Sequence, residues 1–176
     1  KVKTEPGDWV IDGGAANGAT SFQFAREAGR TGKVIAVEPD PFNFAKITAK
    51  GLLSTSSMAR VKPVHVALSD AAGSTRFHAG QGGSSRIAED GGMNVRLTTI
   101  DQLAADHGLE GSGLISLDVE GYEMAALQGG LETIRRLRPK LQVSIYHRKK
   151  DLFAIPLWLK DNLPSYRFYL GHHDAY

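Results

Sequence analysis

The chain contains no cysteine, so it has no disulfides, no thiol nucleophile and no thiolate metal site. This absence is compatible with a reducing compartment, and we expect a cytoplasmic protein. The sequence also lacks the run of about 18 apolar residues that a membrane span needs, and the opening pattern of a signal peptide. The formal net charge is only +2, which is too small a basic excess to indicate a nucleic-acid partner.

What is present is the composition of an ordinary globular domain, with 41% hydrophobic and 23% charged residues in a chain of 176. A domain of this length buries roughly 70% of its unfolded surface. Strand and helix patterns alternate, which predicts one α/β domain over 1–176, with a mainly parallel, twisted sheet and helices on both faces. Because the chain does not begin with Met and reaches its first core strand at Trp9, we expect it to be part of a longer protein.

The apolar patterns predict six strands in chain order. These are Trp9–Ile11, Gly32–Pro41 (a buried strand that ends in an acid and two prolines), Val61–Leu68, Gly113–Leu117, Lys140–Tyr146 and Tyr166–Leu170. Helices are expected from Ala19 to a stop at Gly29, from Pro41 to Gly51, from a capping box at Thr99 to Gly108, from Met124 to a stop at Pro139, and over Leu152–Asn162.

Residues 71–99 break this alternation. Ser74–His78 and Asn94–Thr99 alternate enough for short antiparallel strands, and the loop Ala79–Gly92 between them is rich in glycine and serine. We expect an inserted β-hairpin at one edge of the domain, with a mobile tip that acts as a lid or is simply a solvent loop.

The most informative stretch is Trp9–Gly18, an unbroken apolar run that leads into an acid and a loop of small residues. Dinucleotide enzymes use Gly-x-Gly-x-x-Gly, in which the second glycine lets the backbone meet the pyrophosphate. Ala15 or Ala16 stands at that position, depending on the register, and either methyl group obstructs a diphosphate. The loop therefore favours a smaller ligand whose carboxylate binds at the start of the helix after Gly18.

Glu38 lies 20 residues beyond Gly18, at the end of the second strand. A carboxylate at that place binds the ribose hydroxyls of a nucleoside. An amino-acid carboxylate at the loop and a ribose at Glu38 together describe S-adenosylmethionine, which we expect as the cofactor. In the alternative interpretation, Asp12 only caps the loop and Glu38 is a solvated strand end.

A series of short segments follows in a fixed order along the chain. They are Asp12–Gly18, Val37–Asp40, Ala67–Asp70, Thr98–Asp101 and Asp118–Glu123, joined by Ser84–Ile87 and Ile145–Pro156. This series resembles the FkbM-type S-adenosylmethionine-dependent methyltransferases over nearly the whole chain. The resemblance implies a seven-stranded Rossmann-like sheet with an antiparallel last strand, and methyl transfer to a hydroxyl of a sugar, lipid or natural product.

Three features depart from the family pattern. Ala16 stands where the family often has Asn, and Ser116 stands where Lys usually precedes the Asp-x-Glu-Gly motif. The chain also stops at Tyr176, before the segment that would supply the final strand, so we expect that strand to be missing.

Strand-end positions and the resemblance together give a candidate site. The expected cofactor-binding residues are Asp12, Gly14, Ala15, Asn17, Gly18, Glu38, Pro39, Ala67, Leu68 and Asp118. Asp118 is expected to face the methyl-transfer site, and Glu120 or His147 to remove the proton of the acceptor. Ser84, Ser85 and Arg86 are expected to contact a small-molecule or glycan acceptor.

Other interpretations stay open. Asp118 and Glu120 can instead cap the following helix, or hold a divalent cation through oxygen ligands, although we assign no metal site. His172 and His173 only superficially resemble a metal site. A rival class is an NAD(P)-dependent oxidoreductase or epimerase, although the loop alanines and the lack of a Tyr-x-x-x-Lys pair speak against it. A methyltransferase-like domain retained for binding alone is the other rival.

Overall fold

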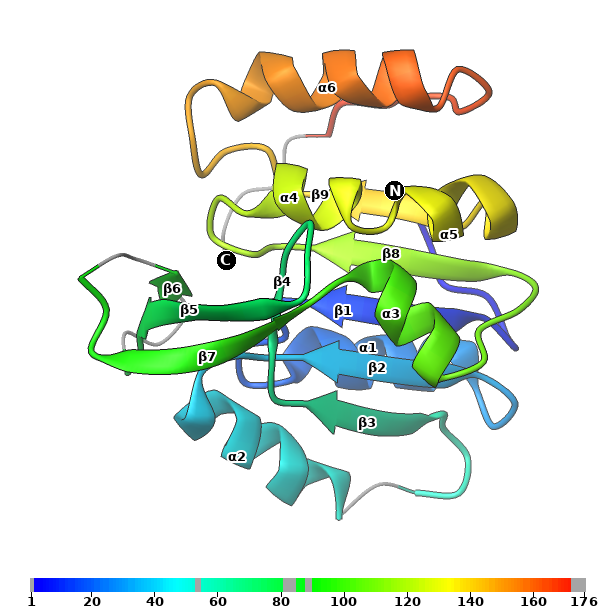
Figure 1. Cartoon of the computed structure of the whole chain (residues 1–176). Coiled ribbons are helices and arrows are strands. Elements are labelled where there is room, and N and C mark those ends of the chain that lie inside the picture. The colour runs from blue at the N-terminus through cyan, green and yellow to red at the C-terminus, as the bar shows by residue number, and fades with distance from the viewer. Residues whose placement is uncertain (1, 53–54, 81–84, 88–89, 172–176) are drawn as a thin grey trace.

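The computed structural model describes residues 2–52, 55–80, 85–87 and 90–171. Five strands form its central sheet: β1 (Trp9–Gly13), β2 (Lys33–Val37), β3 (Arg60–Val64), β8 (Gly113–Leu117) and β9 (Lys140–Val143). Their order is β3-β2-β1-β8-β9, and every pairing between them is parallel (Figure 1). Parallel strands end at one edge of a sheet, so the segments that follow β1, β2 and β8 lie close together.

Helices cover both faces of this sheet. They are α1 (Ala19–Ala28), α2 (Pro41–Gly51), α3 (Ile100–Asp106), α4 (Glu123–Gln128), α5 (Leu131–Leu137) and α6 (Asp151–Asn162). Side chains from α1 and α2 pack with Val10, Val34 and Leu114 on one face. The other four helices pack on the opposite face, and no helix in the described part of the chain is long and apolar enough to cross a membrane.

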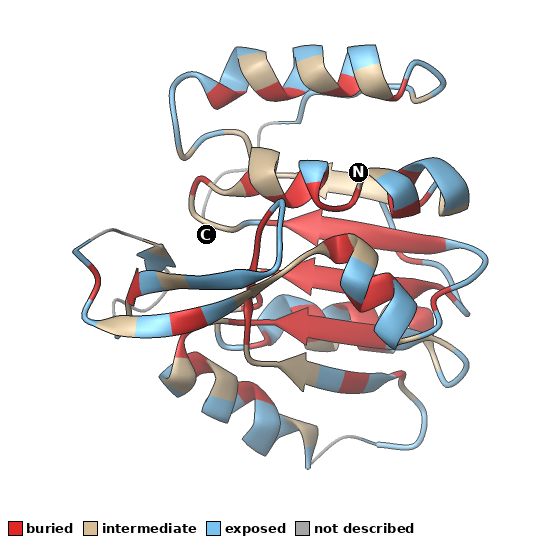
Figure 2. Ribbon diagram, in the orientation of Figure 1, coloured by how far each residue is buried: buried red, intermediate tan, exposed pale blue. Residues whose placement is uncertain are grey.

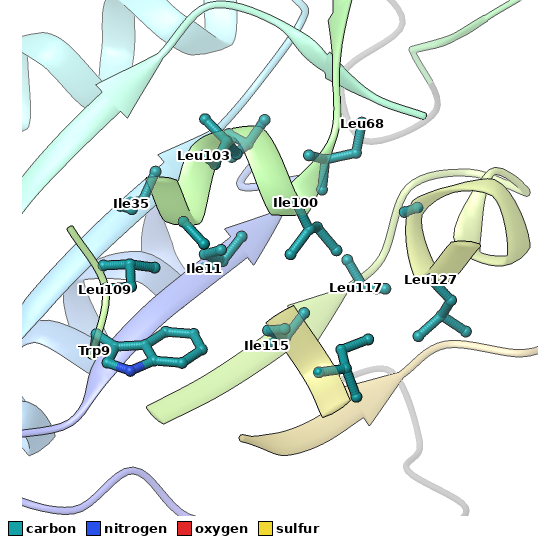
Figure 3. Close-up of a cluster of buried hydrophobic side chains, with 14 of the residues drawn as sticks. Trp9, Ile11, Ile35, Leu68, Ile100, Leu103, Leu109, Ile115, Leu117 and Leu127 are labelled. Carbon is teal, nitrogen blue, oxygen red and sulfur yellow. The ribbon is translucent and has the colours of Figure 1, made fainter. Parts of the chain in front are cut away.

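Two hydrophobic cores, one on each face of the central sheet, explain why the central strands are unbroken apolar runs in the sequence. Ile11, Ile35 and Ile115 lie on neighbouring strands and contact Ile100 and Leu103 from α3 (Figure 3). Because successive residues of a strand point to opposite faces, Val10, Val34 and Leu114 fill the smaller core on the other side. All residues of β1 and β8 are therefore buried, as the red arrows of Figure 2 show.

A second, smaller sheet confirms the inserted hairpin. Its strands are β4 (Ala67–Leu68), β5 (Gly73–His78), β6 (Arg86–Ile87) and β7 (Met93–Thr98), in the order β4-β7-β5-β6. β5 pairs antiparallel with β7 and with β6, so the hairpin carries a further short strand beyond the two that were expected. In Figure 1 this sheet projects past the strand ends of the central sheet.

The predicted strand Val61–Leu68 is wrong as one element, because the chain divides between the two sheets. β3 leaves the central sheet after Val64, and Ala67 and Leu68 pair with β7 instead. His65 fixes the break: its Nε2 atom donates to the carbonyl of Pro39 at 3.0 Å, and its ring stacks on Phe44.

Two further expectations need correction. The helix expected from Met124 to a stop at Pro139 is divided at Gly129 and Gly130 into α4 and α5. Gly129 packs so closely on the second sheet that a Cβ atom there would overlap the carbonyl oxygen of Ser69. The strand expected at Tyr166–Leu170 does not form in the described part of the chain. The Tyr166 hydroxyl donates to the carbonyl of Pro139, and the residues after it are exposed and pair with no described strand.

The strand count also differs from the family expectation. The central sheet holds five strands in the described part of the chain rather than seven, and β9 ends at Val143 rather than Tyr146.

Candidate functional site

The strand ends of the central sheet open into a cleft. One wall comes from the loops after β1, β2 and β8, and the opposite wall from the second sheet. The predicted site residues that line it are Gly14, Glu38, Pro39, Ala67, Leu68, Ser85, Arg86, Asp118 and Glu120. The cleft thus brings together residues that lie more than a hundred positions apart in the sequence.

The loop after β1 turns sharply beneath this cleft. Gly14 has φ +81°, and a Cβ atom there would overlap the carbonyl oxygen of Asp118, so only glycine fits. The amides of Gly14 and Ala15 both donate to the carbonyl of Val37 at 3.1 Å, which fixes the loop against the end of β2. Gly14 is therefore the point at which the β1 loop and the β8 loop touch.

The other predicted loop residues lie away from the cleft lining. Ala15 is buried in the smaller core. Asn17 is exposed, and its side-chain oxygen accepts the amide of Ala19 at 3.0 Å. Gly18 has φ +82° and starts α1 without a side-chain cap. Ala16, which was not on the list of predicted binding residues, lines the cleft instead.

Asp12 is buried beneath the loop and is absent from the cleft lining. The hydroxyl of Ser21 on α1 donates to its carboxylate at 2.5 Å. Burial raises the pKa of Asp12 to about 6, with the nearby charge of Asp118 adding to the rise and Ser21 opposing it. The hydrogen bond from Ser21 ties α1 to β1.

Glu38 occupies the place expected for a ribose-binding carboxylate. It is only 4% exposed but still lines the cleft. Its two oxygens accept the amides of Ala16 at 2.7 Å and of Asp40 at 2.8 Å. Burial raises the pKa of Glu38 to about 7, with the charges of Asp40 and Asp12 adding to the rise and the two amides opposing it.

Asp40 is a contact residue that sequence reasoning missed. One carboxylate oxygen caps α2 by accepting the amides of Phe42 and Asn43. The other accepts the amide of Gly80 at 2.6 Å and the hydroxyl of Ser85 at 2.8 Å. Although burial alone would raise the pKa of Asp40, these hydrogen bonds hold it below its usual value.

Asp40 thus ties the inserted hairpin to the end of β2, next to Glu38. Ser85 takes part in this tie, and Arg86 lines the cleft beside it. Ser84, His172 and His173 lie outside the described residues.

Acidic side chains gather around one histidine at the ends of β8 and β9. His147 Nε2 lies 3.4 Å from Asp118 Oδ1 and 3.5 Å from Glu120 Oε1. Asp118 also accepts the hydroxyl of Tyr146 at 3.0 Å. Glu120 has φ +53°, an unusual backbone for a residue other than glycine. Its pKa is raised by burial and by Asp118 and Glu123, against the opposing charge of His147.

Glu123 is the second residue that sequence reasoning missed. Its side chain is buried at the start of α4, and one oxygen, Oε1, accepts the amides of Val119 at 2.9 Å and Gly121 at 3.3 Å. The same oxygen lies 2.9 Å from His147 Nδ1. An acid in the first turn of a helix is a common dipole-stabilising feature, so the sequence carried no signal that this one faces the site.

These groups include atoms that can hold a metal ion. Asp118, Glu123 and His147 each offer one oxygen or nitrogen atom, and these atoms all lie within 4.8 Å of one another. This set differs from the pair Asp118 and Glu120 considered from the sequence.

A parallel sheet with a cleft at its strand ends, a small-residue loop and a buried acid after the second strand defines a Rossmann-like fold. The chain belongs to the FkbM methyltransferase domain family, whose family model matches residues 12–168. The resemblance inferred from the motif series is thereby confirmed.

Individual relatives are distant. The 2-O-methyltransferase NoeI of Sinorhizobium fredii is 26% identical over 155 residues, which cover 76% of this chain and 62% of NoeI. The hexuronic acid methyltransferase AglP of Haloferax volcanii is 26% identical over 99 residues, which cover 54% of this chain and 40% of AglP. The chain therefore spans less than two thirds of the length of either relative.

A solved structure supports the fold. The crystal structure of methyltransferase FkbM from Methylobacillus flagellatus matches 98% of this chain with a TM-score of 0.75 and 21% identity, and the match covers 42% of that chain. This similarity confirms the Rossmann-like architecture.

Proposed function

We propose that this chain binds S-adenosylmethionine and transfers its methyl group to a hydroxyl of a sugar-type acceptor. The observation that carries the proposal is Glu38, a buried carboxylate that still faces the cleft at the end of β2. Each of its oxygens accepts one amide, and a carboxylate oxygen can accept a second hydrogen bond. The two remaining acceptor positions match the two hydroxyls of a ribose.

The loop after β1 supports the same ligand. Gly14 leaves no side chain between the loop backbone and the cleft, and Ala16 contributes only a methyl group. Pro39, Ala67 and Leu68 add an apolar wall beside Glu38, which suits a purine ring. S-adenosylmethionine supplies an electrophilic methyl group when it is bound. The protein must then hold the acceptor in line and take up its proton.

Glu120 is our choice for the group that takes up the acceptor proton. Its carboxylate lines the cleft and is partly exposed, so an acceptor hydroxyl can reach it. His147 is a poorer choice, because its ring is buried behind Asp118 and Glu120 and is absent from the cleft lining. Asp118 lies at the tip of β8, directly against Gly14, and we assign it to the transfer site.

The relatives indicate the acceptor class. The name of AglP specifies a hexuronic acid, and that of NoeI specifies methylation at a 2-oxygen. We therefore propose a sugar hydroxyl as the acceptor, with Ser85 and Arg86 on the second sheet contacting it.

The first experiment measures thermal stability with S-adenosylmethionine, S-adenosylhomocysteine, NAD⁺ and NADPH in parallel. A ligand at 100 times its dissociation constant stabilises the folded state by about 2.7 kcal/mol. We expect a shift with the two sulfur nucleosides only. A shift confined to the nicotinamide cofactors would overturn the proposal in favour of an oxidoreductase.

A second experiment separates an enzyme from a binding domain. Methyl transfer from labelled S-adenosylmethionine to a panel of sugars is compared for the wild type and Glu120→Gln. Loss of a general base lowers turnover by about 10² to 10⁴ with little change in cofactor affinity. Cofactor binding without turnover on any sugar would instead indicate a domain retained for binding, and normal turnover of Glu120→Gln would remove this residue from the mechanism.

A further inference from the structure

The corner of the site formed by β8, β9 and α4 concentrates negative charge. Three carboxylates, from Asp118, Glu120 and Glu123, each lie within 3.5 Å of a nitrogen of His147. A protonated imidazole offsets one negative charge. The remaining charges repel one another, and this repulsion is strong because Glu123 and His147 are removed from solvent. Such a cluster is stabilised by a bound cation.

Two atoms in this corner also lack the partners that burial demands. Glu123 Oε2 and His147 Nδ1 are buried and have no hydrogen-bond partner among the residues that the structure describes. The side chains are 1% and 9% exposed, respectively. Although Nδ1 is close to Glu123 Oε1, the pair does not meet hydrogen-bond geometry. The large majority of buried side-chain polar atoms are paired, and a bound ion is one explanation for an exception.

We propose that Asp118, Glu123 and His147 bind a divalent cation at the edge of the cleft. Their ligand atoms lie within 4.8 Å of one another. Ligands on opposite sides of an oxygen-bound divalent ion are separated by up to about 4.2 to 5.2 Å, for bonds of about 2.1 to 2.6 Å.

The surrounding backbone holds the deepest ligand in place. The amides of Val119 and Gly121 bind Glu123 Oε1 and leave Oε2 for the ion. Such outer contacts orient metal ligands. Two carboxylates with one imidazole suit first-row ions such as Mn²⁺ rather than Ca²⁺, which prefers oxygen ligands alone.

The position of the site indicates what the ion would do. Asp118 belongs to both the cluster and the cleft lining, so an ion there would border the cleft beside Glu120, where we place the acceptor hydroxyl. A cation at that place polarises an acceptor hydroxyl and offsets the negative charge of the cleft wall. This role depends on the proposed function, but binding of the ion does not.

The test is a titration of the protein with Mn²⁺, without cofactor or acceptor. Binding is measured by the loss of the electron paramagnetic resonance signal of free Mn²⁺. We expect a single tight site. Asp118→Asn and His147→Gln should each weaken binding at least about tenfold. Glu120→Gln removes a charge from the same corner but no ligand, and should change the affinity less than about threefold. A His172→Ala/His173→Ala variant should bind like the wild type.

Asp118 is half exposed, so Asp118→Asn tests the site without endangering the fold. Glu123→Gln keeps an oxygen for the two amides, and its folding is checked by circular dichroism before the titration. Absence of a tight Mn²⁺ site, or equal affinity in the wild type and Asp118→Asn, overturns the proposal. Mn²⁺ binding in a protein that binds no S-adenosylmethionine would overturn the proposed function and leave the cation site standing.

Discussion

At the β2 end of the cleft, every carboxylate oxygen of Glu38 and Asp40 accepts a hydrogen bond from a backbone amide or a hydroxyl. At the β8 and β9 end, one oxygen of Glu123 accepts none within the described ranges, and three carboxylates share one imidazole. Both ends are acidic. In the described part of the chain, the first end has a hydrogen bond on every carboxylate oxygen of Glu38 and Asp40, whereas Glu123 Oε2 at the second end has none.

The two ends of the cleft therefore differ in how fully their carboxylates are hydrogen-bonded before a ligand binds. The β2 end is complete before a ligand arrives, because amides fix Glu38 and leave its outer acceptor positions toward the cleft. At the β8 and β9 end, three carboxylates share the imidazole of His147, so negative groups outnumber the one basic group in contact with them among the described residues. The two ends meet where Gly14 packs against the Asp118 carbonyl.

Gly14→Ala should break the contact between the two ends and have the largest effect. The new Cβ would overlap the Asp118 carbonyl oxygen, and φ +81° is strained for alanine. Steric overlap and backbone strain together should lower the free energy of unfolding by about 3 kcal/mol or more. Urea denaturation measures this loss. The matched control is Gly73→Ala, at a position with no atom within 4 Å of the added Cβ. Equal losses in both variants would contradict the proposed tight contact.

The pH dependence of stability tests how the β2 end is built. The pKa of Glu38 is raised by burial from 4.5 to about 7, so the folded state binds a proton more tightly than the unfolded state. The free energy of unfolding should therefore fall as pH rises from 4.5 to 7, by about 3 kcal/mol from this group. Denaturation at a series of pH values measures the slope.

The control for this slope is Glu38→Gln. Asp12 contributes a similar fall, but in a lower window that ends at its pKa of about 6. The variant should thus lose the pH dependence between about 6 and 7 while keeping the lower part. An unchanged slope between pH 6 and 7 would show that another group is responsible.

Glu38→Gln should also weaken S-adenosylmethionine binding. Hydrogen bonds to a charged group are worth about 1.5 to 3 kcal/mol, so the dissociation constant should rise at least about tenfold. Isothermal titration calorimetry measures it. Glu27→Gln, a change at a partly exposed position on α1 outside the cleft lining, should bind like the wild type. Unaltered affinity in Glu38→Gln would place the ribose elsewhere.

The sequence was a good guide wherever local pattern decides structure. Unbroken apolar runs predicted β1, β2 and β8, because both faces of these strands are covered by helices. Glu38 was found from its place after such a run. These features depend on neighbours in the chain, which the sequence displays directly.

Features decided by distant partners were missed. Val61–Leu68 has the pattern of one strand, and only the contacts of His65 with Pro39 and Phe44 divide it. Glu123 was not predicted as a site residue, because only the fold brings His147, which follows β9, within 2.9 Å of it. Asp40 was not predicted as a site residue, because one pair of its hydrogen bonds reaches residues 80 and 85, far along the chain.

Asp40→Asn should have the smallest effect on the free energy of unfolding. It tests whether Asp40 holds the inserted hairpin against the β2 end of the cleft. The amide keeps one oxygen for the α2 cap, but its NH₂ group cannot accept from Gly80 and Ser85, so we expect a loss of about 1 kcal/mol. Hydrogen exchange at the Gly80 amide should become faster than in the wild type. Ser85→Ala removes only one of the two bonds and should raise that rate less. If Gly80 exchanges equally in all three proteins, Asp40 does not hold the hairpin, and the β2 end is prepared by Glu38 and the loop after β1 alone.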